Sequence, residues 1–188
     1  MAMLQYKHLS PYKIKSMNKR GSYGASWLSD TNGNAFKPSG FWASQGDDWK
    51  NFVLAEGIGK YDETGAVEYK IFVPESSILI AEAKHFAMMD LTPTDNMSYK
   101  PRKNILDVAE ELGYKGVFIN DDMVAKFNHI AYYDVASLIV SNKHSNIIER
   151  ELVKAYTVEE WAFLKKIYDY TNHELWDAYK ENKERDNG

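Results

Sequence analysis

The stretch Lys115–Asn142, KGVFINDDMVAKFNHIAYYDVASLIVSN, decides how the rest of the chain is organised. It holds a short apolar run, a polar break at Asn120-Asp121-Asp122, and then a β-rich run that reaches Val140. Two runs of β-branched and aromatic residues separated by polar residues are typical of paired strands. The pattern therefore predicts two paired strands joined by the polar break, and a buried strand pair is a natural floor for a site.

The composition is that of an ordinary soluble globular protein. The chain has 188 residues, 44% of them hydrophobic and 27% charged, which suits one domain or a domain with an appendage. A net charge of -4 excludes a global basic field for collecting nucleic acid. Binding of nucleic acid through a local basic patch stays possible. The basic residues near the N-terminus are Lys7, Lys13, Lys15, Lys19 and Arg20, although a solvated charged face explains them equally well.

Several classes of site are excluded by the residues that are missing. The chain has no cysteine, so disulfides, thiolate metal sites and cysteine nucleophiles are ruled out. His144 and His173 do not stand at the spacing of a metal ligand set, so no metal is expected. No apolar run approaches the roughly 18 residues of a membrane span, and no signal peptide begins the chain. A cytoplasmic protein without membrane contact is the expectation.

Alternating and helical patterns follow one another along the chain and predict an α+β protein. Strands are expected at residues 3–9, 67–73 and 78–80, a turn entering a short strand at 37–44, and helices at 47–56 and 104–112. From Asn146 onward the pattern is helical, with a Thr157 and Glu160 capping box. Residues 1–142 are therefore predicted to form the domain, and residues 143–188 a helical extension packed on it.

Three short motifs carry a resemblance to a known family. His8-Leu9-Ser10, at the end of the first predicted strand, is similar to an H-G-[ST] motif. Gly40-Phe41-Trp42-Ala43-Ser44 is similar to a G-I-Y-F-[AS] strand, with Trp42 at the stacking tyrosine. The segment 128–136, NHIAYYDVA, resembles a strand that reads N-E-Y-I-V-Y-D-I-A. In this order the motifs resemble those of the ADP-ribosyltransferase fold, including poly(ADP-ribose) polymerases. Segments 8–11, 74–79 and 112–117 are similar to segments of small phage-encoded members of that family.

The resemblance implies a split, mixed or antiparallel sheet with flanking helices that binds NAD. Breaking the bond to nicotinamide passes through a cation-like ribose, so NAD must be held bent and the developing charge stabilised. In this resemblance His8 would hydrogen-bond the ribose hydroxyls. The nicotinamide amide would be held by the backbone at Leu9 and Ser10 and by the hydroxyl of Ser44. The Trp42 ring would stack on the nicotinamide ring. The plainer interpretations are a core residue for Trp42 and a turn residue for Ser10.

The catalytic carboxylate is where the sequence departs from the family, because His129 stands at the position of the family's Glu. Three interpretations stay open. Asp121 or Asp122 supplies the carboxylate from the preceding connection; or His129 acts as a general base on the acceptor; or the protein does not catalyse. Two aspartates beside an asparagine are also simple turn formers.

The function expected from the resemblance is transfer of ADP-ribose from NAD to a macromolecular acceptor, protein or nucleic acid, in phage-host conflict or as a toxin. The alternative is a catalytically inactive protein of the same fold that binds a partner through the helix at 157–179. A third possibility is a relative of the RNA 2'-phosphotransferases, which would need several basic residues in its pocket.

Overall fold

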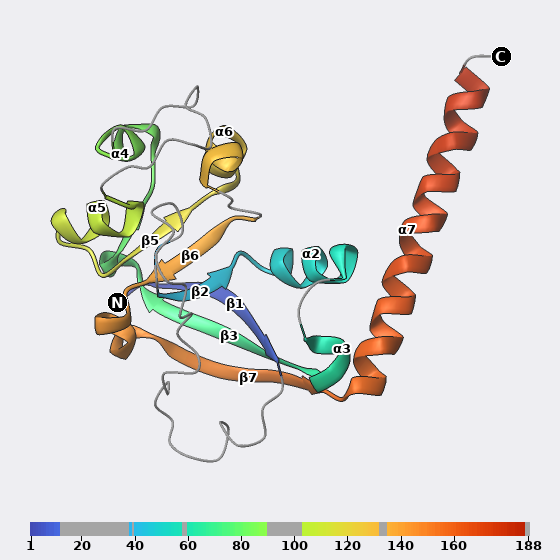
Figure 1. Ribbon diagram of the computed structural model, residues 1–188, viewed down its shortest axis with the longest axis horizontal. Helices are drawn as coiled ribbons and strands as arrows, with labels where there is room; N and C mark the ends of the chain where they lie inside the picture. The colour runs from blue at the N-terminus through green and yellow to red at the C-terminus, as the bar shows by residue number, and fades with distance from the viewer. Residues whose placement is uncertain (12–37, 39, 58–59, 90–102, 132–134, 187–188) are drawn as a thin grey trace.

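The computed structural model describes residues 1–11, 38, 40–57, 60–89, 103–131 and 135–186, with the side chains of 128–131 and 173–186 excepted. Seven strands of this described part form one sheet in the order β4-β5-β6-β2-β1-β3-β7 (Figure 1). The strands are β1 (Met3–Pro11), β2 (Phe41–Ser44), β3 (Ala66–Pro74), β4 (Ile78–Ile80), β5 (Gly116–Ile119), β6 (Ser137–Val140) and β7 (Glu149–Tyr156). The β4–β5 pair is parallel and the other pairs are antiparallel, so the protein is α+β with a mixed sheet.

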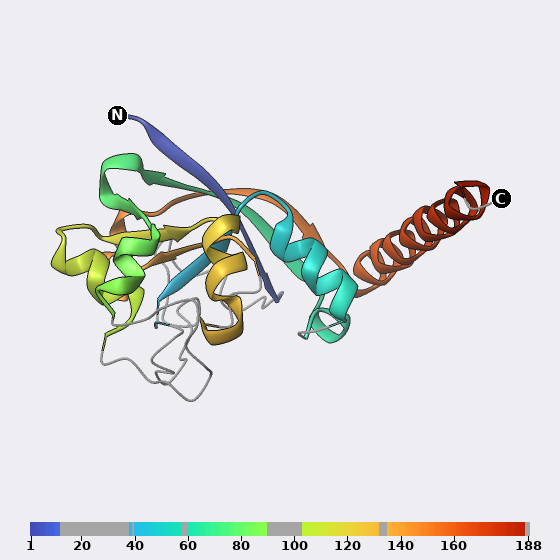
Figure 2. The ribbon, with the colours of Figure 1, turned by 90° about the horizontal axis from the view of Figure 1, so that it is seen from above.

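Helices pack in two groups at opposite ends of the sheet (Figures 1 and 2). They are α2 (Asp48–Glu56), α3 (Tyr61–Thr64), α4 (Ala83–Ala87), α5 (Ile105–Glu111), α6 (Asp121–Ala131) and α7 (Val158–Asp186), with the short 3-10 turns η2 (Glu75–Ser77) and η3 (Asn142–Ile147). The first group, α4, α5 and α6, lies by β4, β5 and β6. The second group, α2, α3 and the start of α7, lies by the far ends of β1, β3 and β7.

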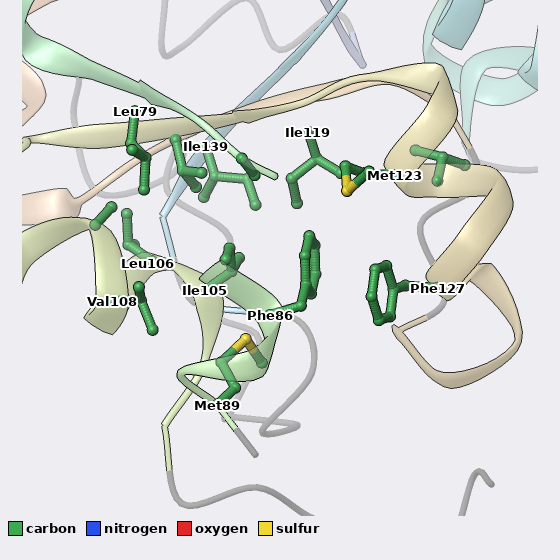
Figure 3. Close-up of a cluster of buried hydrophobic side chains, with 14 residues drawn as sticks. Leu79, Phe86, Met89, Ile105, Leu106, Val108, Ile119, Met123, Phe127 and Ile139 are labelled. Carbon is green, nitrogen blue, oxygen red and sulfur yellow. The ribbon is translucent and has the colours of Figure 1, made fainter. Parts of the chain in front are cut away.

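The core beneath the first helix group consists of aliphatic residues around a pair of phenylalanines. Phe86 of α4 and Phe127 of α6 stack with ring centroids 4.1 Å apart (Figure 3). Ile119 and Ile139 meet them from the sheet, and both are fully buried. Successive side chains of a strand point to opposite faces, so this core belongs to one face of the sheet. We call it the helix face.

The opposite face carries a second core and is called here the His8 face. Tyr6 and His8 alternate with Lys7 along β1, and Tyr6 lies in a cluster with Phe41, Ile71 and Leu138. Lys7 and its pairing partner Ser44 belong to the helix face instead. The two faces therefore divide the residues of the first two motifs between them.

The organising stretch contains a helix where the sequence predicted only a short connection. Strands β5 and β6 pair as expected, with Val117 opposite Ile139, but the whole of α6 joins them. The side chain of Asn120 accepts a hydrogen bond from the Met123 backbone at 3.0 Å, so the polar break is a helix cap. The predicted strand over 128–136 is therefore wrong in its first part, since residues 128–131 continue α6, while residues 132–134 lie outside the described residues.

The second correction concerns the segment that follows Asn146, which the sequence predicted to be helical. Its residues 149–156 form β7, which pairs with β3 and belongs to the main sheet. Helix α7 then begins as predicted, since the Glu160 backbone donates to the Thr157 hydroxyl at 3.1 Å. Its apolar stripe packs on α2 and α3, where Trp161 is almost fully buried against Tyr61.

Candidate functional site

The sheet opens between β1 and β2. Strand β1 pairs with β3 along its whole length, from Met3 to Pro11. Within the described strands it pairs with β2 at one register position, Lys7 with Ser44. The same register would set His8 opposite Ala43, but the described β1–β2 pairing stops at Lys7, while residues 41–44 of β2 stay paired with β6. The two motif strands are neighbours, and the first motif begins where they separate.

His8 is bound to the second motif strand at this point. Its Nδ1 lies 2.6 Å from the carbonyl oxygen of Trp42, and its ring centroid is 4.7 Å from that of Phe41. A carbonyl only accepts, so Nδ1 carries the proton of this bond. Burial lowers the pKa of His8 to about 4, against the hydrogen bond to Trp42, and the charge of Arg150 lowers it further. The imidazole is therefore neutral at physiological pH.

Two residues that the sequence did not single out stand on the same face as His8. Tyr69 of β3 is opposite His8 in the β1–β3 register. The guanidinium carbon of Arg150, from β7, lies 5.2 Å from the centroid of the Tyr69 ring. We call His8, Phe41, Tyr69 and Arg150 the His8 cluster. Phe41 and Tyr69 are buried in the core of this face, so the groups of the cluster suited to an anionic ligand with hydroxyls are the neutral imidazole and the guanidinium.

The other residues of the first motif are engaged within the protein. The Leu9 side chain is buried in the core between α2, α3 and α7. The Leu9 carbonyl oxygen accepts from the Tyr61 hydroxyl at 3.5 Å. Ser10 is half-buried and stands opposite Val67 in the β1–β3 register. Leu9 thus has a structural role, and its carbonyl is not reserved for a nicotinamide amide.

The second motif places its two named side chains on the helix face, away from the His8 ring. Trp42 is half-buried against the core of that face, and its Nε1 donates to the Pro38 carbonyl at 3.2 Å. The buried Ser44 hydroxyl lies 3.4 Å from the Trp49 backbone nitrogen, whose hydrogen bond it accepts. Ser44 therefore stabilises the turn into α2. The structure joins His8 to the backbone of Trp42 but not to its ring.

The candidate acids lie at the beginning of α6. Asp122 is exposed, and its carboxylate is 3.0 Å from the Nζ of Lys126 one turn later. Burial raises the pKa of Asp48, and the nearby charges of Asp121 and then Asp47 raise it further. Because α6 and α2 cover the helix face, these carboxylates do not share a face with His8.

Two further residues bear on the search for a catalytic carboxylate: His129, which stands at the family's Glu position, and Asp48, which lies near Asp121. The backbone of His129 is helical, so its position is not the strand position that the resemblance implied. Its side chain lies outside the described residues. Asp48 is close to Asp121 although the two residues are far apart in the sequence, and no local sequence pattern signals that proximity.

A buried carboxylate, Glu68, lies beneath α2 on the helix face. It is 3% exposed, and its oxygens lie 3.0 Å from Lys7 Nζ, 3.2 Å from Lys50 Nζ and 3.0 Å from the Tyr156 hydroxyl. Lys7 also reaches Asp47 at 2.6 Å. Burial alone would raise the pKa of Glu68, but these partners outweigh it and the pKa is lowered. Two cations balance two carboxylates, which is typical of a structural network.

No family model, no curated protein and no solved structure matches this chain. Among the described residues, no helix is both long and apolar enough to cross a membrane. The same part of the chain contains no group of three or more histidine or acidic side chains that could hold a metal ion. The candidate site is therefore defined by the His8 cluster and by the opening between β1 and β2.

Proposed function

We propose that the protein transfers ADP-ribose from NAD to a macromolecular acceptor, and that the His8 cluster binds the dinucleotide. The observation that carries this proposal is that the described pairing of β1 with β2 is limited to Lys7 and Ser44, although the two strands are neighbours in the sheet. The first two motifs of the resemblance meet there, joined by the hydrogen bond from His8 to the carbonyl of Trp42. A split sheet with these strands side by side is what that resemblance implies.

The chemistry of the His8 cluster is compatible with this reaction. Cleavage of the nicotinamide bond develops positive charge on the ribose, so a neutral His8 binds the ribose hydroxyls without repelling that charge. The guanidinium of Arg150 is suited to the pyrophosphate, because it pairs with phosphate oxygens through two parallel hydrogen bonds. Phe41 and Tyr69 supply rings beside these two polar groups.

In this proposal Asp121 supplies the carboxylate at the opening. It follows β5 at the same end of the sheet where Ser137 and Ser44 pair, next to the last β1–β2 position. Asp122 is a weaker candidate, since it points to solvent and pairs with Lys126. Asp121 lies on the other face of the sheet from the His8 ring, so in this proposal the ligand reaches it by passing between β1 and β2 where their pairing stops.

The test measures nicotinamide release and transfer of labelled ADP-ribose in bacterial lysate, with and without nuclease. His8→Ala and Asp121→Asn are expected to lower the rate by about 100-fold or more, as loss of a catalytic or charge-stabilising group does. His144→Ala and Asp122→Asn are the matched controls and should keep the rate within about threefold of the wild type. Label in a protein or in a nuclease-sensitive band identifies the acceptor.

A binding protein without catalysis is the second candidate, because α7 exposes a row of large apolar residues. Phe163, Ile167 and Tyr170, spaced by four and three positions, are 65%, 47% and 67% exposed. Beyond its packed first part, α7 extends away from the sheet (Figures 1 and 2). If folded protein neither binds NAD in calorimetry nor releases nicotinamide in lysate, the transferase is excluded and this candidate stands.

A further inference from the structure

Strand β7 forms one outer edge of the described sheet. It pairs with β3 on one side, and the sheet order ends with it. An edge strand presents a row of backbone N–H and C=O groups that can pair with another chain. At 8 residues, β7 is much longer than β4, the 3-residue strand at the opposite edge. Its length makes β7 the stronger template for an added strand.

The centre of β7 is apolar and exposed. Leu152 and Val153 are 52% and 43% exposed, whereas the other strands bury most of their aliphatic residues. They are flanked by residues of opposite charge, Glu151 before them and Lys154 after them. An exposed apolar pair on a free sheet edge is characteristic of a surface that another strand covers.

A bulge in β7 places the two flanking charges on the same face. Glu151 is opposite Lys70 and Lys154 is opposite Glu68, with the register shift between them. Glu68 and Lys70 are two residues apart on β3, so their side chains share a face. Glu151 and Lys154 therefore share that face too. Without the extra residue, a spacing of three would have put them on opposite faces.

We propose that two copies of the chain pair through the outer edges of β7, antiparallel and related by a two-fold axis. With the axis between Leu152 and Val153, Glu151 of each copy lies opposite Lys154 of the other. Leu152 of each copy then lies opposite Val153 of its partner. Opposite charges directly across antiparallel strands are stabilising, and the two-fold axis forms the favourable pair twice.

The occupant is a second copy because the charge pattern complements itself. A strand that binds this edge antiparallel needs a cation opposite Glu151 and an anion opposite Lys154, with two aliphatic residues between them. Read in reverse, β7 itself supplies that order. No other partner chemistry is needed to cover the exposed apolar pair or to pair both charges.

Lys154 has partners within its own chain, but they are weak competitors. Its Nζ lies 3.3 Å from Glu160 and 4.8 Å from the centroid of the Tyr156 ring. Both side chains of that ion pair are about half exposed. Because exposed ion pairs contribute little to stability, Lys154 loses little free energy when it leaves Glu160 and pairs with Glu151 of a second copy.

The test is a charge exchange followed by sedimentation equilibrium of the full chain at several concentrations and at low salt. The wild type is expected to dimerise. Glu151→Lys or Lys154→Glu alone sets like charges opposite each other, and each should weaken the dimer by at least about tenfold. The double variant Glu151→Lys with Lys154→Glu restores opposite charges, so its dissociation constant should return to within about threefold of the wild type.

The controls separate this pairing from other causes. Glu160→Gln removes the partner of Lys154 within the chain and should leave the dimer unchanged. Thermal unfolding of each variant checks that the exchange has not unfolded the chain. A wild type that stays monomeric up to about 1 mM overturns the proposal, since bulges and edge charges also serve to keep edges apart. So does a dimer that ignores the single exchanges, which would point to the exposed row on α7.

Discussion

His8 is a histidine that the fold keeps uncharged. Burial lowers its pKa to about 4, from an ordinary value of 6.5, and the nearby Arg150 adds to the effect. In the unfolded chain the same imidazole takes up a proton at its ordinary pKa. Between pH 6.5 and 4 the unfolded state therefore binds more protons than the native state, so the free energy of unfolding decreases as the pH falls.

We expect this single side chain to cost at most about 3 kcal/mol of stability by pH 4. His8→Gln cannot take up the proton, so its free energy of unfolding should decline less than that of the wild type between pH 7 and pH 4. Urea titrations at half-unit pH steps measure the difference. Parallel curves for the two proteins would show that His8 is charged in the native state.

At the scale of elements, the docking of α7 depends on one face of its first three turns. Trp161 is 2% exposed and lies with its ring centroid 5.2 Å from Tyr61 and 5.9 Å from Tyr156. Phe163, two residues later, points to solvent and is 65% exposed. The two positions are a matched pair of large aromatic residues on one helix, differing in burial.

Trp161→Ala is therefore expected to lower the free energy of unfolding by about 3 to 5 kcal/mol, through lost burial and a cavity. Phe163→Ala should change it by less than about 0.5 kcal/mol. Chemical denaturation of both variants gives the comparison. Equal losses would mean that α7 is held through its other side.

The elements that sequence patterns missed are those whose identity depends on distant partners. Asn120 caps α6 as a helix, yet the β-branched and aromatic residues after it favour a strand locally. Packing of Phe127 against Phe86 decides for the helix. Similarly, residues 149–156 are mostly exposed and half of them are charged, and pairing with β3 makes them a strand. Short, strongly alternating runs such as β3 needed no such help and were predicted correctly.

The residues of the candidate site also fall into those that a local motif signals and those that only the strand order brings together. The motifs of His8 and Trp42 were predicted to contribute to one site; the structure joins His8 to the backbone carbonyl of Trp42, whereas the Trp42 ring packs on the helix face. Tyr69 and Arg150 reach His8 only through the order of the strands, which no local pattern contains. Residues that meet across sheet neighbours are found from topology, and topology was not available from one sequence.

At the scale of the whole molecule, Glu68 ties together segments far apart in the chain. Its carboxylate receives Lys7 from β1, Lys50 from α2 and Tyr156 from the end of β7. Glu68→Ala leaves two lysines near each other and largely buried, so we expect a loss of about 3 kcal/mol or more. Glu149→Ala, on the exposed edge, is the control and should lie within about 0.5 kcal/mol of the wild type.

The loss of stability in Glu68→Ala is expected to depend on pH. The pKa of Glu68 is lowered in the native state, so its contribution is complete above its ordinary pKa of 4.5 and is lost as the pH falls through the native value. Differences between wild type and Glu68→Ala should therefore shrink in acid. A difference that stays constant down to pH 2 would assign the loss to packing and not to charge.

The position of β1 also orders events during synthesis. This first strand ends up between β2 and β3, so much of the sheet forms while the chain is still being made. The outer side of β3 waits for β7, and the Glu68 carboxylate waits for Tyr156. Until β7 emerges from the ribosome, a nascent chain therefore exposes an unpaired strand and an acid that lacks one of its partners, and unpaired strand edges of this kind promote aggregation.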